Sequence, residues 1–445
     1  MTDAFILRKD WKDMVDLHDR MGRITKEQVV AFASANFGSN YVCVFKRTGE
    51  NKDAFKVTKP KITAIDIKRD GKSAWRIEWE KMPSATLAPE FIDYNAAIQR
   101  RTLNSGVPLA VVKNPTNDLF SLRYILDMGT NNDRELKVAV EYLPYLGTAK
   151  YSPSAFQQEL FKMGLSVDVF VGEDRCYITL SGLEKNLATG VDLMEELLAT
   201  AQPNDEALKA LVADIGKARQ DELKSKGAIL NAGLVSYAKY GALSAFNDVL
   251  PAARLKEITS AELLDRIHGL TGYEHMVFYY GRKSADDVAA LLKEKHKTAA
   301  KLKAYPAARV YPELPTTSNA VYFADFDMVQ AEMMLVSKAG PFDVEKMPYA
   351  SLFNEYFGSG LSSIVFQEIR EAKALAYGAS ASYTTPTKKE EAHYVRAFIG
   401  TQADKLNDAV AAMLVLMNDM PMAKEQFEGA KASALKVIAS TRITK

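Results

Sequence analysis

The chain has 445 residues, of which 47% are hydrophobic and 25% are charged, and its formal net charge is +1. This length exceeds one ordinary hydrophobic core and predicts two or three structural units. The balanced charge gives no basic surface for nucleic acid, and the longest apolar run, 409–417, is too short to span a bilayer. We therefore expect a soluble globular protein with no nucleic-acid partner and no membrane insertion.

The first residues, M-T-D-A-F-I-L-R-K-D-W, have neither the apolar core nor the small-residue cleavage site of a signal peptide, so the compartment stays unknown. The two cysteines, Cys43 and Cys176, are far apart, which excludes a metal knuckle or a disulfide framework. Each lies in an apolar, strand-like run. We therefore predict two buried thiols.

The chain contains two internal repeats. Residues 24–45 align without a gap with residues 258–279, and each copy reads as a helix, a glycine turn and a strand. Thr25 and Thr259 are predicted to cap the two helices at their N-terminal ends. The first copy therefore predicts a strand around Cys43.

The second repeat pairs residues 158–168 with residues 367–377, each preceded by a Tyr-x-Gly turn and followed by two strands. Strands and helices occur in groups. This order predicts an α+β fold in which two-layer sandwich units, each an antiparallel-rich sheet packed against helices, are duplicated. The segment 58–93 fits neither copy and is predicted to be an extended linker.

The repeats also make a prediction about the two ends of the chain. The alignment places residue 1 late in one unit and residue 445 early in another. We therefore expect a fragment of a longer polypeptide. On the same grounds, the N-terminal segment 1–50 could complete the last unit, either in its own chain or in a neighbouring one, so a homodimer is possible.

Residues 147–170, G-T-A-K-Y-S-P-S-A-F-Q-Q-E-L-F-K-M-G-L-S-V-D-V-F, resemble part of the pitrilysin/insulinase (inverzincin) family of zinc metallopeptidases. In that family the signature H-x-x-E-H precedes a Gly-Thr pair, a helix and a strand. Counting back from the Gly-Thr pair places the signature on residues 138–142. Val138 and Tyr142 then stand at the two histidine positions, and only Glu141 is kept.

The resemblance therefore implies a degenerate zinc motif. A catalytic zinc ion needs about three protein ligands and an open position for water. Valine has no lone pair, and tyrosine is a poor ligand at neutral pH because its ordinary pKa is about 10. We expect no metal at Val138, Glu141 and Tyr142, and instead a helix that packs Val138, Tyr142 and Leu146 inward.

The histidines offer no substitute site, because no two of them are spaced four residues apart. Each is predicted to be an ordinary surface or packed residue. They are His18, His268, His275, His296 and His393.

Residues 357–377, F-G-S-G-L-S-S-I-V-F-Q-E-I-R-E-A-K-A-L-A-Y, resemble the C-terminal half of the same family. The resemblance implies that Arg370 and Tyr377 bind the substrate and its transition state at a zinc site in another half. The chemistry fits, because a guanidinium donates to peptide carbonyls and a phenol can donate to an oxyanion. Ala379 and Ala381, on the same strand face, would leave room for the peptide. In the alternative, Arg370 belongs to a charged surface and Tyr377 to the core.

The resemblance covers nearly the whole chain and implies four parts. Residues 1–57 are the tail of a preceding family domain, and residues 58–95 link the two halves. Residues 96–300 are the third family domain with the degenerate zinc motif, and residues 301–445 are a truncated fourth domain with the Arg/Tyr motif.

The function implied is that of the C-terminal, substrate-binding half of a two-halved zinc metalloendopeptidase, which hydrolyses peptides in a closed chamber. The chain alone is expected to be inactive and to have no cofactor, with zinc in the N-terminal half or a partner subunit. The alternative is a non-catalytic chamber or assembly subunit, similar to those of processing peptidases or respiratory-complex cores, beside a zinc-bearing chain. A working H-x-x-E-H upstream in the same reading frame would favour the enzyme.

Overall fold

The computed structural model describes residues 2–46, 49, 73–83 and 86–442. The chain divides into two compact units, Met1–Ser84 and Ala85–Lys445, and each is described by itself. Among the described residues no helix is long and apolar enough to cross a membrane.

The first unit consists of helices, with bounds α1 Thr2–Ile6, α2 Trp11–Val15, α3 Leu17–Met21, α4 Lys26–Asn36 and α5 Ala74–Lys81. Thr25 caps α4 as predicted: its hydroxyl accepts from the backbone of Gln28, whose side chain accepts from the Thr25 backbone N–H. The predicted strand is wrong, because residues 41–46 form no strand and Cys43 is exposed. The predicted extended linker is also wrong at α5, while its residues 58–72 lie outside the described part of the chain.

The second unit contains two sheets, and the first has the strand order β1-β2-β6-β3-β5-β4. All neighbouring strands are antiparallel except β2 and β6, which are parallel. The bounds are β1 Gln99–Thr102, β2 Pro108–Lys113, β3 Leu119–Leu126, β4 Leu165–Val171, β5 Cys176–Leu183 and β6 Met276–Gly281. Alternate residues of β3, from Phe120 to Leu126, point into a core covered by helices.

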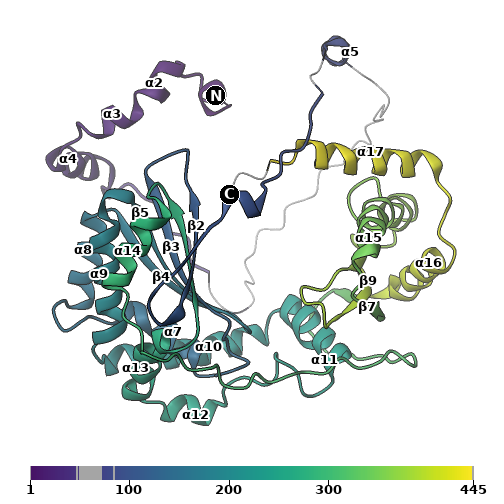
Figure 1. The fold of residues 1–445 in the computed structure, drawn as a ribbon. Helices are drawn as coiled ribbons and strands as arrows, with labels where there is room; N and C mark the ends of the chain where they lie inside the picture. The colour runs from purple at the N-terminus through teal and green to yellow at the C-terminus, as the bar shows by residue number, and fades with distance from the viewer. Residues whose placement is uncertain (1, 47–48, 50–72, 84–85, 443–445) are drawn as a thin grey trace. The chain divides into compact units, whose positions relative to one another are not determined.

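The helices of this part surround the sheet, and α8, α9 and α14 lie along one of its faces (Figure 1). Their bounds are α6 Tyr94–Ala97, α7 Leu136–Tyr142, α8 Pro153–Lys162, α9 Leu187–Thr200, α10 Asp205–Glu222, α11 Val235–Tyr240, α12 Ala252–Glu257, α13 Ser260–Gly269 and α14 Ala285–Lys295. Thr259 and Glu262 form a capping box at the start of α13, as the repeat predicts. Cys176 is buried in β5, as predicted, and burial raises the pKa of its thiol to about 12.

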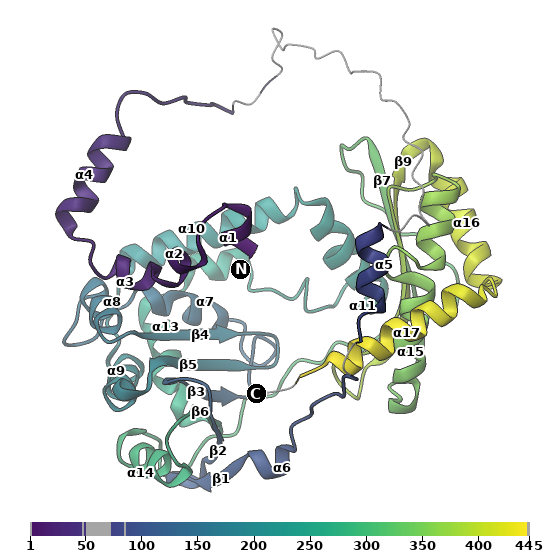
Figure 2. The ribbon, with the colours of Figure 1, turned by 90° about the horizontal axis from the view of Figure 1, so that it is seen from above.

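The second sheet has the order β7-β9-β8 and is antiparallel throughout. Its strands are β7 Gln330–Pro341, β8 Gly378–Thr384 and β9 Ala392–Gln402, and its α-helices are α15 Met347–Phe353, α16 Leu406–Asn418 and α17 Lys424–Ser440. Figure 2 shows the three helices gathered beside β9. Residues 354–358 and 366–372 form short π-helical turns.

The two sheets repeat one plan. The order β3–α7–α8–β4–β5–α9–α10 recurs as β7–α15–(366–372)–β8–β9–α16–α17. Gly147 and Gly358, which end the two Tyr-x-Gly turns, are both places where a Cβ would collide with a neighbouring backbone carbonyl, of Tyr151 and Ala381 respectively. The predicted α+β fold with duplicated two-layer units is therefore confirmed.

Candidate functional site

The helix predicted to carry a degenerate zinc motif, α7, is packed into the core. Val138 and Tyr142 are 4% and 0% exposed, and Leu146 beyond the helix is also buried. Glu141 is partly exposed, and its carboxylate lies 3.9 Å from Nζ of Lys137, one turn earlier. The two positions predicted to correspond to the family histidines therefore lie in the core.

The Tyr142 hydroxyl is occupied by hydrogen bonds. The backbone N–H of Asn204 donates to it at 2.6 Å, and it lies 3.0 Å from Oγ of Ser260. Since Ser260 donates its own proton to Asp205, the Tyr142 hydroxyl donates to Ser260. The phenol is buried and engaged by Asn204 and Ser260, so a metal there would have to compete with both contacts. Residues 138–142 therefore do not fit a zinc ion, and the described residues contain no cluster of metal-ligating side chains.

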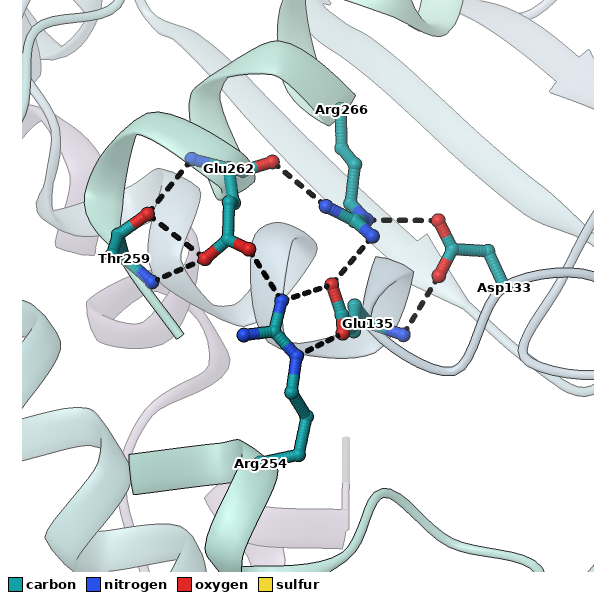
Figure 3. A network of polar contacts seen from close by, with 6 residues as sticks. All are labelled: Asp133, Glu135, Arg254, Thr259, Glu262 and Arg266. Carbon is teal, nitrogen blue, oxygen red and sulfur yellow. Dashed lines mark hydrogen bonds and ion pairs between the residues drawn. The ribbon is translucent and has the colours of Figure 1, made fainter. Parts of the chain in front are cut away.

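An ion-pair network fixes the start of α7 (Figure 3). The Glu135 carboxylate accepts from Arg254 at 2.8 Å and lies 2.5 Å from Nη2 of Arg266, which also binds Asp133 at 2.9 Å. Arg254 also donates to Glu262, and this hydrogen bond lowers the pKa of the Glu262 carboxyl to about 2. These contacts join α7 to α12 and α13, so the network has a structural role.

A second polar cluster lies in the core of the first sheet. Nε2 of His275 lies 2.8 Å from Nε2 of His296, and Nδ1 of His296 lies 2.7 Å from the carboxylate of Glu195. The Tyr124 hydroxyl donates to the same carboxylate, and His275 Nδ1 lies 2.7 Å from the carbonyl of Tyr273. Between two imidazole nitrogens one must donate and the other accept, so one of the two rings is neutral.

Burial lowers the pKa of His275 and so favours its neutral form, and its Nδ1–H donates to the carbonyl of Tyr273. The two rings cannot share a metal ion, because two ligand nitrogens on one zinc ion stand farther apart than 2.8 Å. Sequence reasoning missed the cluster because its members are distant in the chain. No short-range spacing in the sequence predicts this cluster.

The Arg/Tyr motif lies on the surface of the second sheet. Arg370 belongs to the π-helical turn 366–372, and Tyr377 directly precedes β8. The Arg370 guanidinium carbon lies 4.7 Å from the ring centre of Phe366 and 5.5 Å from that of Tyr377. Tyr377 is 78% exposed, so the alternative that places it in the core is wrong.

The guanidinium lies over both aromatic rings, the Arg370 side chain is 40% exposed, and its Nε lies 3.8 Å from the Glu371 carboxylate. A guanidinium can donate to peptide carbonyls or a carboxylate. Sequence reasoning missed Phe366, although its spacing of four residues from Arg370 in a helical segment is a recognisable signal.

The surroundings of Tyr377 differ from the prediction in one respect. Ala381 is 3% exposed and packs in the core of the second sheet, and Ala379 packs against the same core. Ala379 and Ala381 thus contribute to the core, whereas Tyr377 is exposed. A ligand at this site would lie over Arg370 and Tyr377.

Residues 258–434 match the family model described as "Peptidase M16 inactive domain". The resemblance to the pitrilysin/insulinase family is confirmed. The match includes both α13 and the Arg/Tyr motif but not residues 138–142. No curated protein matches the sequence.

Solved structures share the fold. A peptidase M16 inactive domain from Pseudomonas fluorescens is 16% identical with a TM-score of 0.57, and the match covers 77% of this chain and 84% of that one. The periplasmic protease PqqL from Escherichia coli is 12% identical with a TM-score of 0.62, and the match covers 93% of this chain and 44% of that one. The ferredoxin protease FusC, solved with Arabidopsis ferredoxin, is 12% identical with a TM-score of 0.63 and the same coverages.

The chain thus spans less than half the length of PqqL and FusC, whereas it covers most of the Pseudomonas domain. At these identities the likeness shows the fold. The family model that matches residues 258–434 describes an inactive domain of peptidases.

Proposed function

We propose that this chain is the C-terminal, substrate-binding half of a two-halved zinc metalloendopeptidase. The zinc is held by a half that lies elsewhere in the same polypeptide or in a partner subunit. In this proposal residues 96–300 and 301–445 are the third and fourth family domains, preceded by the tail of another domain, 1–57, and a linker, 58–95. The chain binds the peptide in a closed chamber and does not hydrolyse it alone.

The observation that carries the proposal is the exposed pair formed by Arg370 and Tyr377. A guanidinium held 5.5 Å from the ring centre of an exposed tyrosine presents donors of two kinds on one surface. The guanidinium suits the carbonyl groups of an extended peptide, and the phenol suits the oxyanion that develops when a peptide bond is attacked. Phe366 supports the pair because its ring limits the rotamers of Arg370.

The side chains at residues 138–142 support the proposal that zinc is held by another half. Val138 offers no ligand atom, and the Tyr142 hydroxyl is engaged with Asn204 and Ser260. Any zinc chemistry must therefore come from residues outside 138–142. The match to this chain covers only 44% of the proteases PqqL and FusC. This supports the proposal that the chain is one of two halves.

The first test is metal analysis of the purified chain together with a fluorogenic peptide assay. We expect far less than one zinc ion per chain and no cleavage. One zinc ion per chain, with turnover abolished by a chelator, would refute the proposal.

The second test measures binding of a fluorescein-labelled, unstructured peptide to the full chain by fluorescence anisotropy. Arg370→Gln should weaken binding by about tenfold or more, because a hydrogen bond to a charged group contributes about 1.5–3 kcal/mol. Lys373→Gln, which removes a cation from the same turn of chain, is the matched control and should bind as the unaltered chain does. Equal affinities for all three proteins would place the peptide elsewhere and favour a non-catalytic assembly subunit.

A further inference from the structure

The chain between Arg370 and Tyr377 makes a turn at a residue with an unusual backbone conformation. Ala374 has a φ of 48°, in the left-handed region, where the Cβ of a residue other than glycine is crowded. Its side chain is exposed, so burial of that side chain does not impose the conformation. A non-glycine residue keeps such a conformation only where its surroundings hold the backbone. The contacts on either side of Ala374 must therefore hold this turn.

Two backbone hydrogen bonds hold the turn on the side of Arg370. The N–H of Lys373 donates to the carbonyl of Glu368 at 3.2 Å. The N–H of Leu375 donates to the carbonyl of Ile369 at 3.0 Å. Ile369 is fully buried and directly precedes Arg370. The turn is thus tied to the part of the backbone from which the guanidinium extends.

Strand β9 holds the turn on the side of Tyr377. The hydroxyl of Thr401 donates to the carbonyl of Leu375. The backbone N–H of Tyr377 donates to the carbonyl of Gly400 at 2.9 Å. Both backbone polar groups of Leu375 are therefore engaged, its N–H by Ile369 and its carbonyl by Thr401. One side-chain hydroxyl completes the set of contacts that fixes the turn.

Thr401 lies in the core of the second sheet, below the surface on which Arg370 and Tyr377 lie. It is 2% exposed and follows Ala397 and Ile399, which are buried on the same face of β9. Valine has nearly the shape of threonine and is buried without the cost of a polar group. What threonine adds at this position is therefore the hydrogen bond to the Leu375 carbonyl.

The held backbone has a consequence for the two exposed side chains. The Arg370 side chain is 40% exposed and Tyr377 is 78% exposed, yet the guanidinium carbon lies 5.5 Å from the centre of the tyrosine ring. Two exposed side chains on a loose loop would sample many rotamers, and ordering them on binding would cost affinity. A backbone fixed between them keeps the ring within reach of the guanidinium before any ligand binds.

We propose that Thr401 is a positioning residue for the pair formed by Arg370 and Tyr377. Its hydroxyl holds the carbonyl of Leu375, and the left-handed turn at Ala374 then carries the chain from the guanidinium to the phenol at one fixed spacing. The inference rests on the proposed function, in which this pair binds the peptide. Because Thr401 is buried, it acts through Leu375 and Tyr377 and does not touch the peptide itself.

The first measurement is fluorine NMR of the full chain with its tyrosines replaced by fluorotyrosine. The Tyr377 signal is assigned by its absence from Tyr377→Phe, and Arg370→Gln gives its shift without the guanidinium. Thr401→Val should move the signal toward that shift. Thr401→Ser keeps the hydroxyl and should restore the position found in the unaltered chain. A residue that only stabilised the core would not move the signal of an exposed ring.

Thr384→Val is the matched control. The Thr384 hydroxyl also donates to a backbone carbonyl, that of Tyr394 at 3.1 Å, but Thr384 lies at the other end of β8 from Tyr377. Its substitution should lower the urea midpoint without moving the Tyr377 signal.

Ala374 offers a second test at an exposed position, where a substitution does not disturb the core. Glycine adopts a positive φ without strain, so Ala374→Gly should leave the Tyr377 signal in place. Valine is β-branched and resists this conformation, so Ala374→Val should move the signal. This pair of variants decides the question even if Thr401→Val does not fold.

The second measurement is binding of the fluorescein-labelled, unstructured peptide. Thr401→Val should weaken binding by about two- to tenfold, the factor for ordering one side chain on binding, whereas Thr384→Val should bind as the unaltered chain does. A Tyr377 signal that stays in place in Thr401→Val or in Ala374→Val would overturn the positioning role. So would an unchanged affinity of Thr401→Val where Arg370→Gln binds more weakly.

Failure of the proposed function has a different signature. In that case Arg370→Gln leaves the peptide affinity unchanged, while Thr401→Val still moves the Tyr377 signal.

Discussion

The buried histidine pair makes stability depend on pH in a defined direction. Burial lowers the pKa of His275, so the folded protein resists protonating this ring while the unfolded chain accepts a proton at its ordinary pKa of about 6.5. The contribution of His275 to the free energy of unfolding is therefore fully present above pH 6.5 and is lost as the pH falls toward the folded pKa. At pH 5 the loss approaches an upper limit of about 2 kcal/mol, if the folded ring stays neutral.

The assay is urea unfolding of the unaltered chain and of His275→Gln at pH 7.5 and pH 5.0. Glutamine keeps a donor and an acceptor but does not titrate. The unaltered chain should therefore lose up to about 2 kcal/mol more than the variant between the two pH values. His268→Gln removes an exposed histidine from α13 and should leave the pH dependence unchanged. If the unaltered chain and His275→Gln lose the same free energy on acidification, the reasoning about the neutral ring is wrong.

Three further outcomes are expected. Tyr377→Phe, in the enzyme assembled with its zinc-bearing half, should lower kcat at least about tenfold without changing the unfolding midpoint, because it removes one oxyanion donor from an exposed side chain; unchanged turnover would end its proposed role. Tyr142→Phe should cost about 1–3 kcal/mol of stability in urea unfolding, because it leaves the Asn204 N–H and Ser260 without their partner; a neutral result would contradict the hydrogen-bond chain. Gly358→Ala should lower the free energy of unfolding by about 1–3 kcal/mol or more in the same urea assay, because the added Cβ collides with the Ala381 carbonyl. Gly429→Ala, whose added Cβ would contact no neighbouring atom, should leave that free energy unchanged or raise it.

The fold could be predicted where local signals coincide with the tertiary structure. Both copies of the first repeat begin with a threonine followed three residues later by Gln28 or Glu262, and both form a capping box. Helix starts of this kind depend on residues adjacent in the chain, so one sequence is enough to find them. The glycines of the two Tyr-x-Gly turns could also be recognised from the sequence. At each of them a neighbouring backbone carbonyl lies too close for a Cβ atom.

The errors arise where a prediction needs a partner from elsewhere. The run around Cys43 has the composition of a buried strand, but a strand requires a neighbour to satisfy its backbone, and no described strand pairs with it. The contact of His275 with His296, and of His296 with Glu195, likewise depends on three elements meeting in the core. Neither a strand edge nor a buried polar cluster has a signature in local spacing.

The two tyrosines of the family motifs separate stability from ligand binding within one chain. Tyr142 is fully buried and its hydroxyl accepts a hydrogen bond in the core, so the position predicted to correspond to a zinc ligand contributes to packing. Tyr377 is exposed, and its ring lies beside the Arg370 guanidinium. Removing its hydroxyl should therefore leave the free energy of unfolding unchanged. The expected opposite behaviour of Tyr142→Phe and Tyr377→Phe follows from these environments. This difference supports the proposal that the chain holds a peptide without cleaving it.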